Sequence, residues 1–252
     1  MAGGRLTGKT AIITGAGSGL GKAAAERYVA EGARVLVADI DLTQAAAVCE
    51  QLGDAAVPAQ ADVSDPTAVA GMVATGVEAF GTIDVLFSNA GVAESVKPLA
   101  EISEAEWDRI IDVNLKAFFL CARAMAPVMR SAGGGSMIVT ASIAARRPRS
   151  GMAAYVASKA GVIGLARALA VELAGDGIRV NVINPGPAQT PMLREFSLAA
   201  TEAEALQTLG AALPLGHAIQ PADIAAAAVY LASDEARNVT GLVMNVDGGR
   251  DL

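Results

Sequence analysis

TAIITGAGSGLG, residues 10–21, joins a short β-branched run to a glycine-rich turn, and a helical run follows as far as Ala30. The residues before Gly15 suit a buried strand, and the glycines let the chain turn tightly into a helix. Backbone N–H groups at such a helix N-terminus can approach a phosphate closely. The stretch therefore predicts a strand–turn–helix unit that binds a pyrophosphate, with an ordinary glycine turn as the alternative.

The alternation of strand and helix continues along the chain. Further β-branched runs occur at residues 34–38, 56–60, 84–88, 136–140, 179–183 and 242–246, with helix-periodic segments between them. Parallel strands joined by helical crossovers form sheets that are covered on both faces. No linker or repeat divides the chain. We therefore predict an α/β fold: a single Rossmann-type, doubly wound domain over residues 1–252, with a seven-stranded parallel sheet and helices on both faces.

Composition excludes several classes of protein. Hydrophobic residues make up 53% and charged residues 18% of the chain, which excludes intrinsic disorder. The net charge of −7 argues against a nucleic-acid partner. No uninterrupted apolar run reaches the ~18 residues of a membrane span, and no signal-peptide core precedes Gly15. We expect no membrane association, a cytoplasmic location, and buried thiols at Cys49 and Cys121 instead of a disulfide.

Ligands bind doubly wound sheets at the carboxyl ends of the strands. Asp39 ends the second run, where a carboxylate can bind the ribose of NAD and repel the 2′-phosphate of NADP. Its neighbours Ser18 and Ile40 bring no positive charge; a solvated turn aspartate is the alternative. After the third run come Asp62 and Val63, which suit contacts with adenine. After the fourth come Asn89-Ala90-Gly91, whose small residues let the backbone pass close to the cofactor. The expected NAD contacts here are Gly15, Ser18, Gly19, Leu20, Gly21, Asp39, Asp62, Val63, Asn89, Ala90 and Gly91.

Tyr155 and Lys159 share one face of a helix-periodic segment, residues 153–174, because they lie four residues apart. A phenol of pKa about 10 needs roughly 4 kcal/mol of stabilisation of its anion to act as a base near neutrality. An ammonium about 4 Å away supplies on the order of 4 kcal/mol at an effective dielectric near 20. The pair is therefore adequate as an activated acid–base, although an isolated pair with this spacing is common by chance.

Two polar residues strengthen this interpretation. Ser142 follows the fifth β-branched run, and its hydroxyl can hold the oxygen on which Tyr155 acts. Asn114 lies inside a helical run over residues 104–130, where asparagine is a mediocre helix former. It either holds water next to Lys159 or is a tolerated exception in the helix.

Together these motifs resemble the short-chain dehydrogenase/reductase family over essentially the whole chain, residues 5–252. Residues 14–21 are similar to its TGxxxGxG loop, residues 89–91 to its NAG element and residues 155–159 to its YxxxK motif. The closing Asp247-Gly248-Gly249 is also similar. Ser142, Asn114, Pro185, Gly186 and Thr190 fall where the family has its serine, its asparagine and its nicotinamide segment.

The resemblance implies an NAD-dependent oxidoreductase that interconverts a small-molecule secondary alcohol and its ketone. Tyr155 would be the acid–base, and Lys159 would lower its pKa and bind the nicotinamide ribose. Ser142 would orient the substrate, and Asn114 would sustain a proton relay through water. The further cofactor contacts implied are Tyr155, Lys159, Pro185, Gly186 and Thr190.

Two segments should face the substrate: residues 143–152 and a flap over residues 187–213, whose apolar candidates are Met192, Leu193, Phe196, Leu206 and Leu209. The cluster of Arg146, Arg147 and Arg149 suits either capture of an anionic substrate group or a solvated loop or subunit interface, and we favour the second. His217 is expected to be structural. A lone histidine with two cysteines leaves no zinc set, so we expect no metal.

Other functions and the assembly remain open. A 3-oxoacyl thioester reductase fits the resemblance, but such enzymes usually prefer NADPH, against which Asp39 argues. A nucleotide-binding regulatory protein would need no complete set of Asn114, Ser142, Tyr155 and Lys159. The family implies a homotetramer. Two helices suit packing between subunits, and internal packing of their residues on the sheet is the alternative. The residues are Ala153, Ala157, Ala160, Gly161, Gly164 and Ala168 on the later helix and Trp107, Phe118 and Phe119 on the earlier one.

Overall fold

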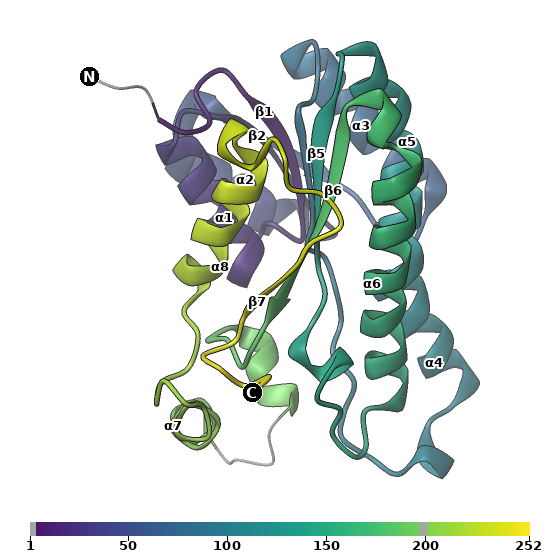
Figure 1. Cartoon of the computed structure of the whole chain (residues 1–252), viewed down its shortest axis with the longest axis vertical. Helices are drawn as coiled ribbons and strands as arrows, with labels where there is room; N and C mark the ends of the chain where they lie inside the picture. Colours follow the sequence, from purple (N-terminus) through teal and green to yellow (C-terminus); the bar gives the residue numbers. More distant parts are fainter. Residues whose placement is uncertain (1–3, 197–200) are drawn as a thin grey trace.

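The computed structural model describes residues 4–196 and 201–252, so residues 1–3 of the expected domain and 197–200 of the expected flap lie outside it. One parallel sheet has the strand order β3-β2-β1-β4-β5-β6-β7 (Figure 1), which confirms the predicted seven-stranded sheet. No predicted strand bound differs from the structure by more than two residues. The strands are β1 (Thr10–Thr14), β2 (Arg34–Asp39), β3 (Ala56–Gln60), β4 (Val85–Ser88), β5 (Gly135–Thr140), β6 (Ile178–Pro185) and β7 (Val243–Val246).

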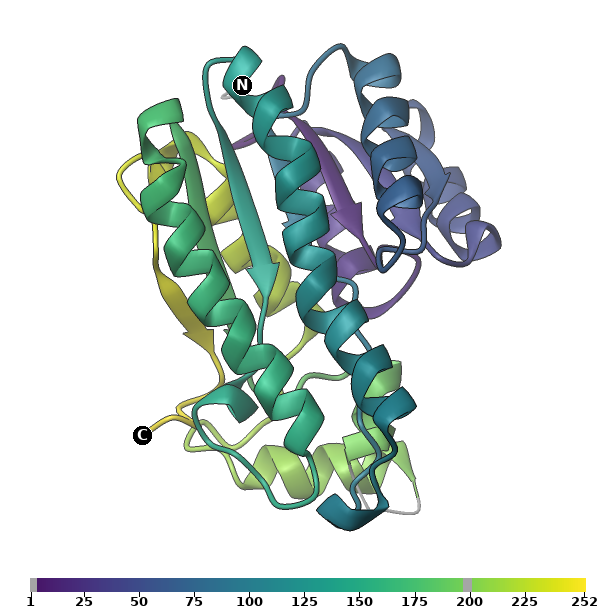
Figure 2. The same ribbon diagram turned by 90° about the vertical axis from the view of Figure 1, so that its right-hand side faces the viewer.

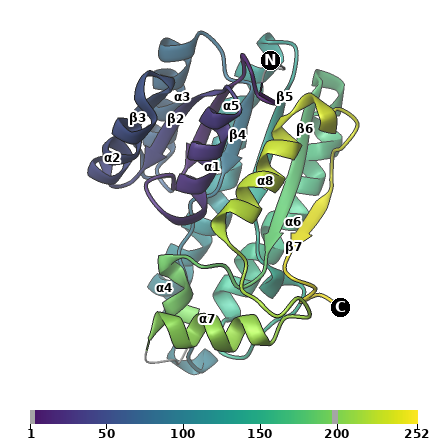
Figure 3. The same cartoon turned by 90° about the vertical axis from the view of Figure 1, so that its left-hand side faces the viewer.

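Helices cover both faces of the sheet, as predicted. One face carries α1 (Gly19–Ala30), α2 (Leu42–Leu52) and α8 (Pro221–Ala232), and the other carries α3 (Pro66–Phe80), α5 (Ala117–Ser131) and α6 (Ala153–Glu172) (Figures 1 and 3). All of β1 is buried, with Ile13 in the first hydrophobic core and Ile12 in the second. Successive strand residues therefore feed two separate cores, because side chains alternate across a sheet.

The predicted helical run over residues 104–130 is not one helix. It consists of α4 (Glu104–Ile111), a π-helical turn over Asp112–Lys116 and α5, which lies beside α6 (Figure 2). The turn contains Asn114. One extra residue in a helical turn widens it and redirects the side chains that follow, and such turns are frequent at functional sites.

Helix α6 is the one described helix that is long and apolar enough to cross a membrane by length and composition, with a mean hydropathy of 1.3 over its apolar window. Its buried face packs on the sheet within the second core, and Lys159 is buried along it. These are the contacts of a core helix.

The strand order reverses beside β1, which pairs with β2 on one side and β4 on the other. The carboxyl ends of the strands face a short 3₁₀ segment (Pro191–Phe196) and α7 (Glu202–Ala211). Both lie past the ends of the strands in Figure 1. The topology therefore brings the residues after β1, β2, β4, β5 and β6 to one end of the molecule.

Candidate active site

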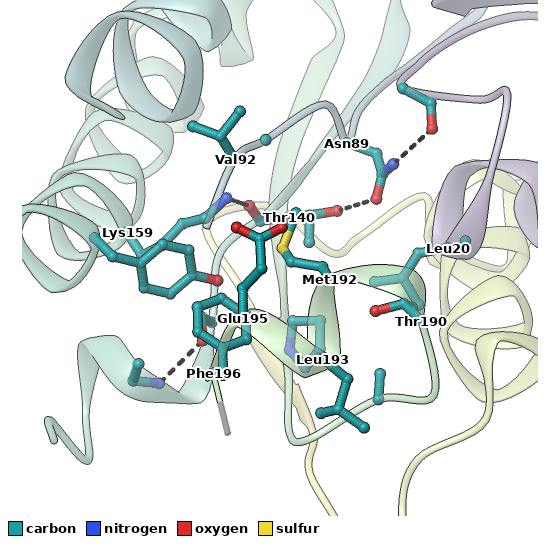
Figure 4. Close-up of a pocket in the computed structure, with 18 of the residues that line it drawn as sticks. Leu20, Asn89, Val92, Thr140, Lys159, Thr190, Met192, Leu193, Glu195 and Phe196 are labelled. Carbon is teal, nitrogen blue, oxygen red and sulfur yellow. Dashed lines mark hydrogen bonds between the residues drawn. The ribbon is translucent and has the colours of Figure 1, made fainter. Parts of the chain in front are cut away.

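A pocket of about 970 Å³ lies at this end, between the β1–α1 turn and the segment before α7 (Figure 4). All but two of the site residues predicted from the sequence line it; the exceptions are Gly21 and Asn114. The lining residues are Gly15, Ser18, Gly19, Leu20, Asp39, Asp62, Val63, Asn89, Ala90, Gly91, Ser142, Tyr155, Lys159, Pro185, Gly186 and Thr190.

Glycines shape the β1–α1 turn through close backbone contacts. Gly15 has φ +63°, and a Cβ there would lie 2.8 Å from the Ala90 Cα atom. A Cβ on Gly21 would lie 2.2 Å from the carbonyl oxygen of Gly15, so Gly21 supports the turn from behind the pocket. Ser18 precedes α1 without a side-chain cap, and the first turn of α1 holds no acid. This bare helix N-terminus at the pocket wall fits a pyrophosphate.

Asp39 lies at the pocket wall at the end of β2. Its Oδ2 atom accepts a hydrogen bond from the Gly17 N–H at 2.9 Å and its Oδ1 atom from the Asp41 N–H at 3.1 Å. No lysine or arginine of the described residues forms an ion pair with it. Asp62 is held similarly, because its Oδ1 atom accepts from both the N–H and the hydroxyl of Ser64.

Asn89 joins three strand ends. Its Nδ2 atom donates to the Thr14 carbonyl at 3.2 Å, and its Oδ1 atom accepts from the Thr140 hydroxyl at 3.1 Å. The Thr14 hydroxyl oxygen accepts in turn from the N–H groups of Asn89 and Ala90. Because the ends of β1, β4 and β5 are thereby tied together, the pocket floor is fixed by side chains as well as by the sheet.

Tyr155, Lys159 and Ser142 converge at the other end of the pocket. Tyr155 is 6% exposed and Lys159 is 4% exposed. The Lys159 Nζ atom donates to the Thr140 carbonyl at 2.9 Å and lies 5.8 Å from the centre of the Tyr155 ring. The Ser142 Oγ atom accepts from the Ala144 N–H at 3.1 Å.

The pKa values of the pair follow their burial. Burial raises the pKa of Tyr155 to about 12, and the hydrogen bond with Ser142 opposes this only in part. Burial lowers the pKa of Lys159 to about 8. The pKa of Tyr155 therefore lies above that of a free phenol, opposite to the expected direction, because burial disfavours the phenolate.

Asn114 is buried and hydrogen-bonded. From the π-helical turn its Oδ1 atom accepts from the Val92 N–H at 2.8 Å, and its Nδ2 atom donates to the Val92 carbonyl at 3.0 Å and to the Ser158 hydroxyl at 3.3 Å. A Cβ on Gly91 would lie 3.1 Å from the Asn114 Oδ1 atom and 3.4 Å from the Lys159 Nζ atom. Gly91 therefore lets both polar groups approach the pocket.

The segment before α7 supplies apolar side chains to the pocket. The Phe196 ring packs at 5.0 Å and 59° on the Tyr155 ring, and Met192 and Leu193 also line the pocket. Leu209 lines it as well. Leu206 does not.

The arginine cluster divides. The Nε atom of Arg146 pairs with Asp251 at 2.5 Å, and Arg147 donates to the Leu252 carbonyl. Arg149 donates to the Phe196 carbonyl at 3.3 Å, and both Arg147 and Arg149 line the pocket. A structural role in a solvated loop therefore fits Arg146, whereas Arg147 and Arg149 also face the cavity.

Sequence reasoning missed several lining residues. Thr140 ends β5, so the strand-end rule applied to it could have found it. Glu195 extends its carboxyl group into the pocket from the 3₁₀ segment before α7 (Figure 4), and only its charge within an apolar segment signalled it. Val92 and Arg109 carried no signal. His217 does not line this pocket, and among the described residues no cluster of histidine, cysteine and acidic groups suits a metal ion.

Comparisons with known proteins identify the family of the chain. A family model described as Enoyl-(Acyl carrier protein) reductase matches residues 15–251. The chain is 38% identical to cyclohexanol dehydrogenase from Acinetobacter sp. (strain SE19), over 97% of this chain and 95% of that protein. It is 38% identical to 3-oxoacyl-[acyl-carrier-protein] reductase from Thermotoga maritima, over 97% and 98%.

A solved structure has the same fold. The crystal structure of 3-ketoacyl-(acyl-carrier-protein) reductase from Brucella melitensis complexed with NADH superposes with a TM-score of 0.92 at 36% identity, covering 98% of this chain and 100% of that one. The predicted resemblance is thus confirmed by sequence and by structure. The chain belongs to the short-chain dehydrogenase/reductase family and is an oxidoreductase of CH–OH groups that uses a nicotinamide cofactor.

Proposed function

We propose that this protein is an NAD-dependent dehydrogenase that interconverts a small-molecule secondary alcohol and its ketone. Residues 1–252 would form one cofactor-binding and catalytic domain, with residues 187–213 as a flap over the substrate. The observation that carries the proposal is the convergence of Ser142, Tyr155 and Lys159 on the pocket that the glycine turn also lines.

Each side chain has a role that its position supports. The Ser142 hydroxyl would bind the substrate oxygen, and the Tyr155 phenol would exchange a proton with it. The Lys159 ammonium, held by the Thr140 carbonyl, would bind the nicotinamide ribose. Asn114 would hold a water next to Lys159 through which the proton reaches solvent. The bound nicotinamide supplies the hydride acceptor or donor and, when oxidised, a positive charge that favours the phenolate.

The direction of the pKa shift separates the two reaction directions. With a pKa of about 12, the Tyr155 phenol keeps its proton at neutral pH, which suits donation to a carbonyl oxygen in reduction. In oxidation the phenol must act as a base, so its pKa has to fall when cofactor binds. Lys159, with a pKa of about 8, is still mostly protonated at neutral pH, and its charge favours the phenolate.

The walls of the pocket fit NAD. The bare N-terminus of α1 would bind the pyrophosphate, and Asp39 would bind the adenosine ribose while repelling a 2′-phosphate. Asp62 and Val63 would contact adenine. Asn89, Ala90, Gly91, Pro185, Gly186 and Thr190 would line the remaining length. The NADH in the Brucella reductase supports this choice of cofactor.

A 3-oxoacyl thioester reductase is the second candidate. Arg147, Arg149 and Arg250 line the pocket, and guanidinium groups suit the phosphates of thioester carriers. A panel of secondary alcohols, sugars, sterols, ketones and 3-oxoacyl thioesters, followed by NADH absorbance, separates the two candidates. A regulatory protein without turnover would accept none of these compounds.

The mechanism is tested by Tyr155→Phe. This change keeps the ring and removes the proton-transfer group, so kcat should fall by at least the ~10²–10⁴ of general acid–base catalysis, while NAD affinity changes little. Tyr230→Phe is the matched control, because Tyr230 lies on α8 outside the pocket. If Tyr155→Phe keeps most of the parent's turnover, the acid–base is another group and the assignment is wrong.

The cofactor choice is tested by Asp39→Asn, which keeps the side-chain shape and removes its charge. The ratio of kcat/KM for NAD to that for NADP should be large in the parent and fall at least about tenfold in the variant, a change of roughly 1.4 kcal/mol. Asp54→Asn, at an exposed aspartate outside the pocket, should leave the ratio unchanged. Equal use of NADP by the parent would refute the proposal.

A further inference from the structure

Glu94 is a buried acid outside the pocket lining. Its side chain is on the segment that follows Gly91, and the residue is only 1% exposed. The Oε2 atom accepts a hydrogen bond from the backbone N–H of Tyr155 at 2.7 Å. The Oε1 atom has no hydrogen-bond partner among the described residues. Burying a polar group with an unpaired atom is unfavourable, so its retention calls for an explanation.

The first turn of α6 lacks a cap of its own. The first N–H groups of a helix have no partner within it and are commonly bound by a side chain of the residue just before the helix. Met152 occupies that position and forms no such bond, and the first turn of α6 contains no acid. Glu94 therefore supplies the missing acceptor from a distant segment, to the third residue of the helix, which is Tyr155.

Residues 94–97, here called the brace, also hold the turn before α6. The Lys97 N–H donates to the Gly151 carbonyl at 3.2 Å. Gly151 has φ +81°, and a Cβ there would lie 2.8 Å from a methyl group of Val96. Val96 packs on the small apolar cluster that contains Tyr155. The brace thus contacts the chain on both sides of Met152.

The brace is continuous with the cofactor end of the pocket. Asn89, Ala90 and Gly91 line the pocket, and the chain runs on through Val92, which Asn114 ties to Ser158 of α6. This segment therefore holds α6 at two positions. It contacts Ser158 through Asn114, and it contacts Tyr155 directly through Glu94.

We infer that Glu94 is a positioning residue for Tyr155: through the hydrogen bond to the Tyr155 N–H it sets the first turn of α6 so that the phenol meets the substrate oxygen beside Ser142. The inference rests on the proposed role of Tyr155. A misplacement of the order of 1 Å at a reacting group costs about 10²-fold in rate, so a backbone contact can control turnover without touching the substrate.

The test compares Glu94→Ala, Glu94→Gln and Asp223→Ala. The alanine variant loses the acceptor, whereas glutamine keeps an oxygen for the Tyr155 N–H. Asp223 is the control, because its side chain accepts from the Gln220 N–H at the N-terminus of α8, outside the main pocket. Amide hydrogen exchange and the kinetics of cyclohexanol oxidation by NAD are measured on each variant.

We expect faster exchange of the Tyr155 amide in Glu94→Ala and a kcat that falls at least about tenfold, with KM for NAD within about twofold. Glu94→Gln should restore both the slow exchange and most of kcat. Asp223→Ala should lower thermal stability and leave kcat and the Tyr155 amide unchanged.

Three results would overturn the inference. The first is an unchanged Tyr155 amide in Glu94→Ala, which is decisive even if cyclohexanol is not a substrate. The second is a parental kcat in Glu94→Ala when Tyr155→Phe is inactive. The third is a loss of kcat in Asp223→Ala that matches the loss in Glu94→Ala at the same loss of stability. If Tyr155→Phe itself stays active, the proposed function fails, whatever the exchange data show about Glu94.

Discussion

Lys159 shows how one buried residue combines structural cost with chemical use. Its ammonium donates a hydrogen bond to the Thr140 carbonyl and sits inside the protein at 4% exposure. A surface lysine would keep its usual pKa of 10.5, whereas burial lowers that of Lys159 to about 8. The protein therefore holds a cation where it is unfavourable, beside the phenol that the proposed mechanism has to ionise.

The unfavourable burial of the Lys159 ammonium predicts that the stability of the parent relative to Lys159→Met depends on pH. Between pH 8 and 10.5 the unfolded lysine holds a proton that the folded one has released, so the free energy of unfolding of the parent rises with pH by up to about 3 kcal/mol. Methionine lacks this contribution. The stability of the parent relative to the variant should therefore increase across this window, as measured by urea denaturation at several pH values.

The control for this measurement is Lys116→Met. Lys116 is about half exposed and pairs with Asp112 on the surface, so its substitution should give a difference that does not change over the same range. Parallel curves for the parent and Lys159→Met would mean that Lys159 does not titrate as its burial requires.

At the scale of the element, the sequence predicts helix ends well where the capping residues are adjacent in the chain. Asp65-Pro66 predicts a capped helix start, and the Asp65 side chain does accept from the Thr67 N–H at the start of α3. The run over residues 104–130 shows the limit. A π-helical turn adds one residue to a turn, which barely changes the hydrophobic period of the sequence, so the run still looks like one helix.

What selects the wider turn is a partner from elsewhere. Asn114 satisfies both the N–H and the carbonyl of Val92, a residue 22 positions earlier that no helix or strand of its own would pair. An unpaired backbone group in the interior is costly, so the loop and the turn stabilise each other. The pairing exists only once α5, α6 and the loop after β4 have come together.

At the scale of the whole molecule, the N-terminal two-thirds of α6 exposes mainly small residues. Phe119 and Trp107 are 43% and 39% exposed on the neighbouring helices, whereas Phe118 is buried, so the expectation that Phe118 adds to a packing surface was wrong. Internal packing on the sheet does not explain the exposed small residues of α6, which are Ala153, Ala157, Ala160, Gly164 and Ala168; Arg167, Val171 and Glu172 are also exposed on this helix. A flat surface of this kind suits close approach of another helix.

We predict, as the family resemblance implies, a homotetramer in which α6 packs against a second subunit. Light scattering at micromolar concentration should give four times the mass of one chain. Ala168→Glu should shift the mass to smaller species, because it places a charge in the packed surface. The control is Ala47→Glu, at an exposed position on α2, which should leave the mass unchanged. A monomeric parent would refute the prediction.

The sequence by itself determined the parallel sheet, the glycine turn and the identity of the side chains at its carboxyl end. These follow from short-range physics: strand and helix periods, the positive φ of Gly15, and the rule that parallel strands end on one edge. That is why the sequence indicates Asp39, Ser142 and Tyr155, which the fold brings to one pocket.

Only the tertiary structure decided which groups those side chains meet. Glu94 reaches a backbone N–H that lies 61 residues away, and Lys159 reaches the carbonyl of Thr140, contacts that no local pattern encodes. The pKa shifts of Tyr155 and Lys159 were equally beyond the sequence: the spacing favours a lowered pKa of Tyr155, whereas burial raises it. The reason is that desolvation depends on every element packed around a group, whereas sequence spacing fixes only its nearest neighbours on the helix.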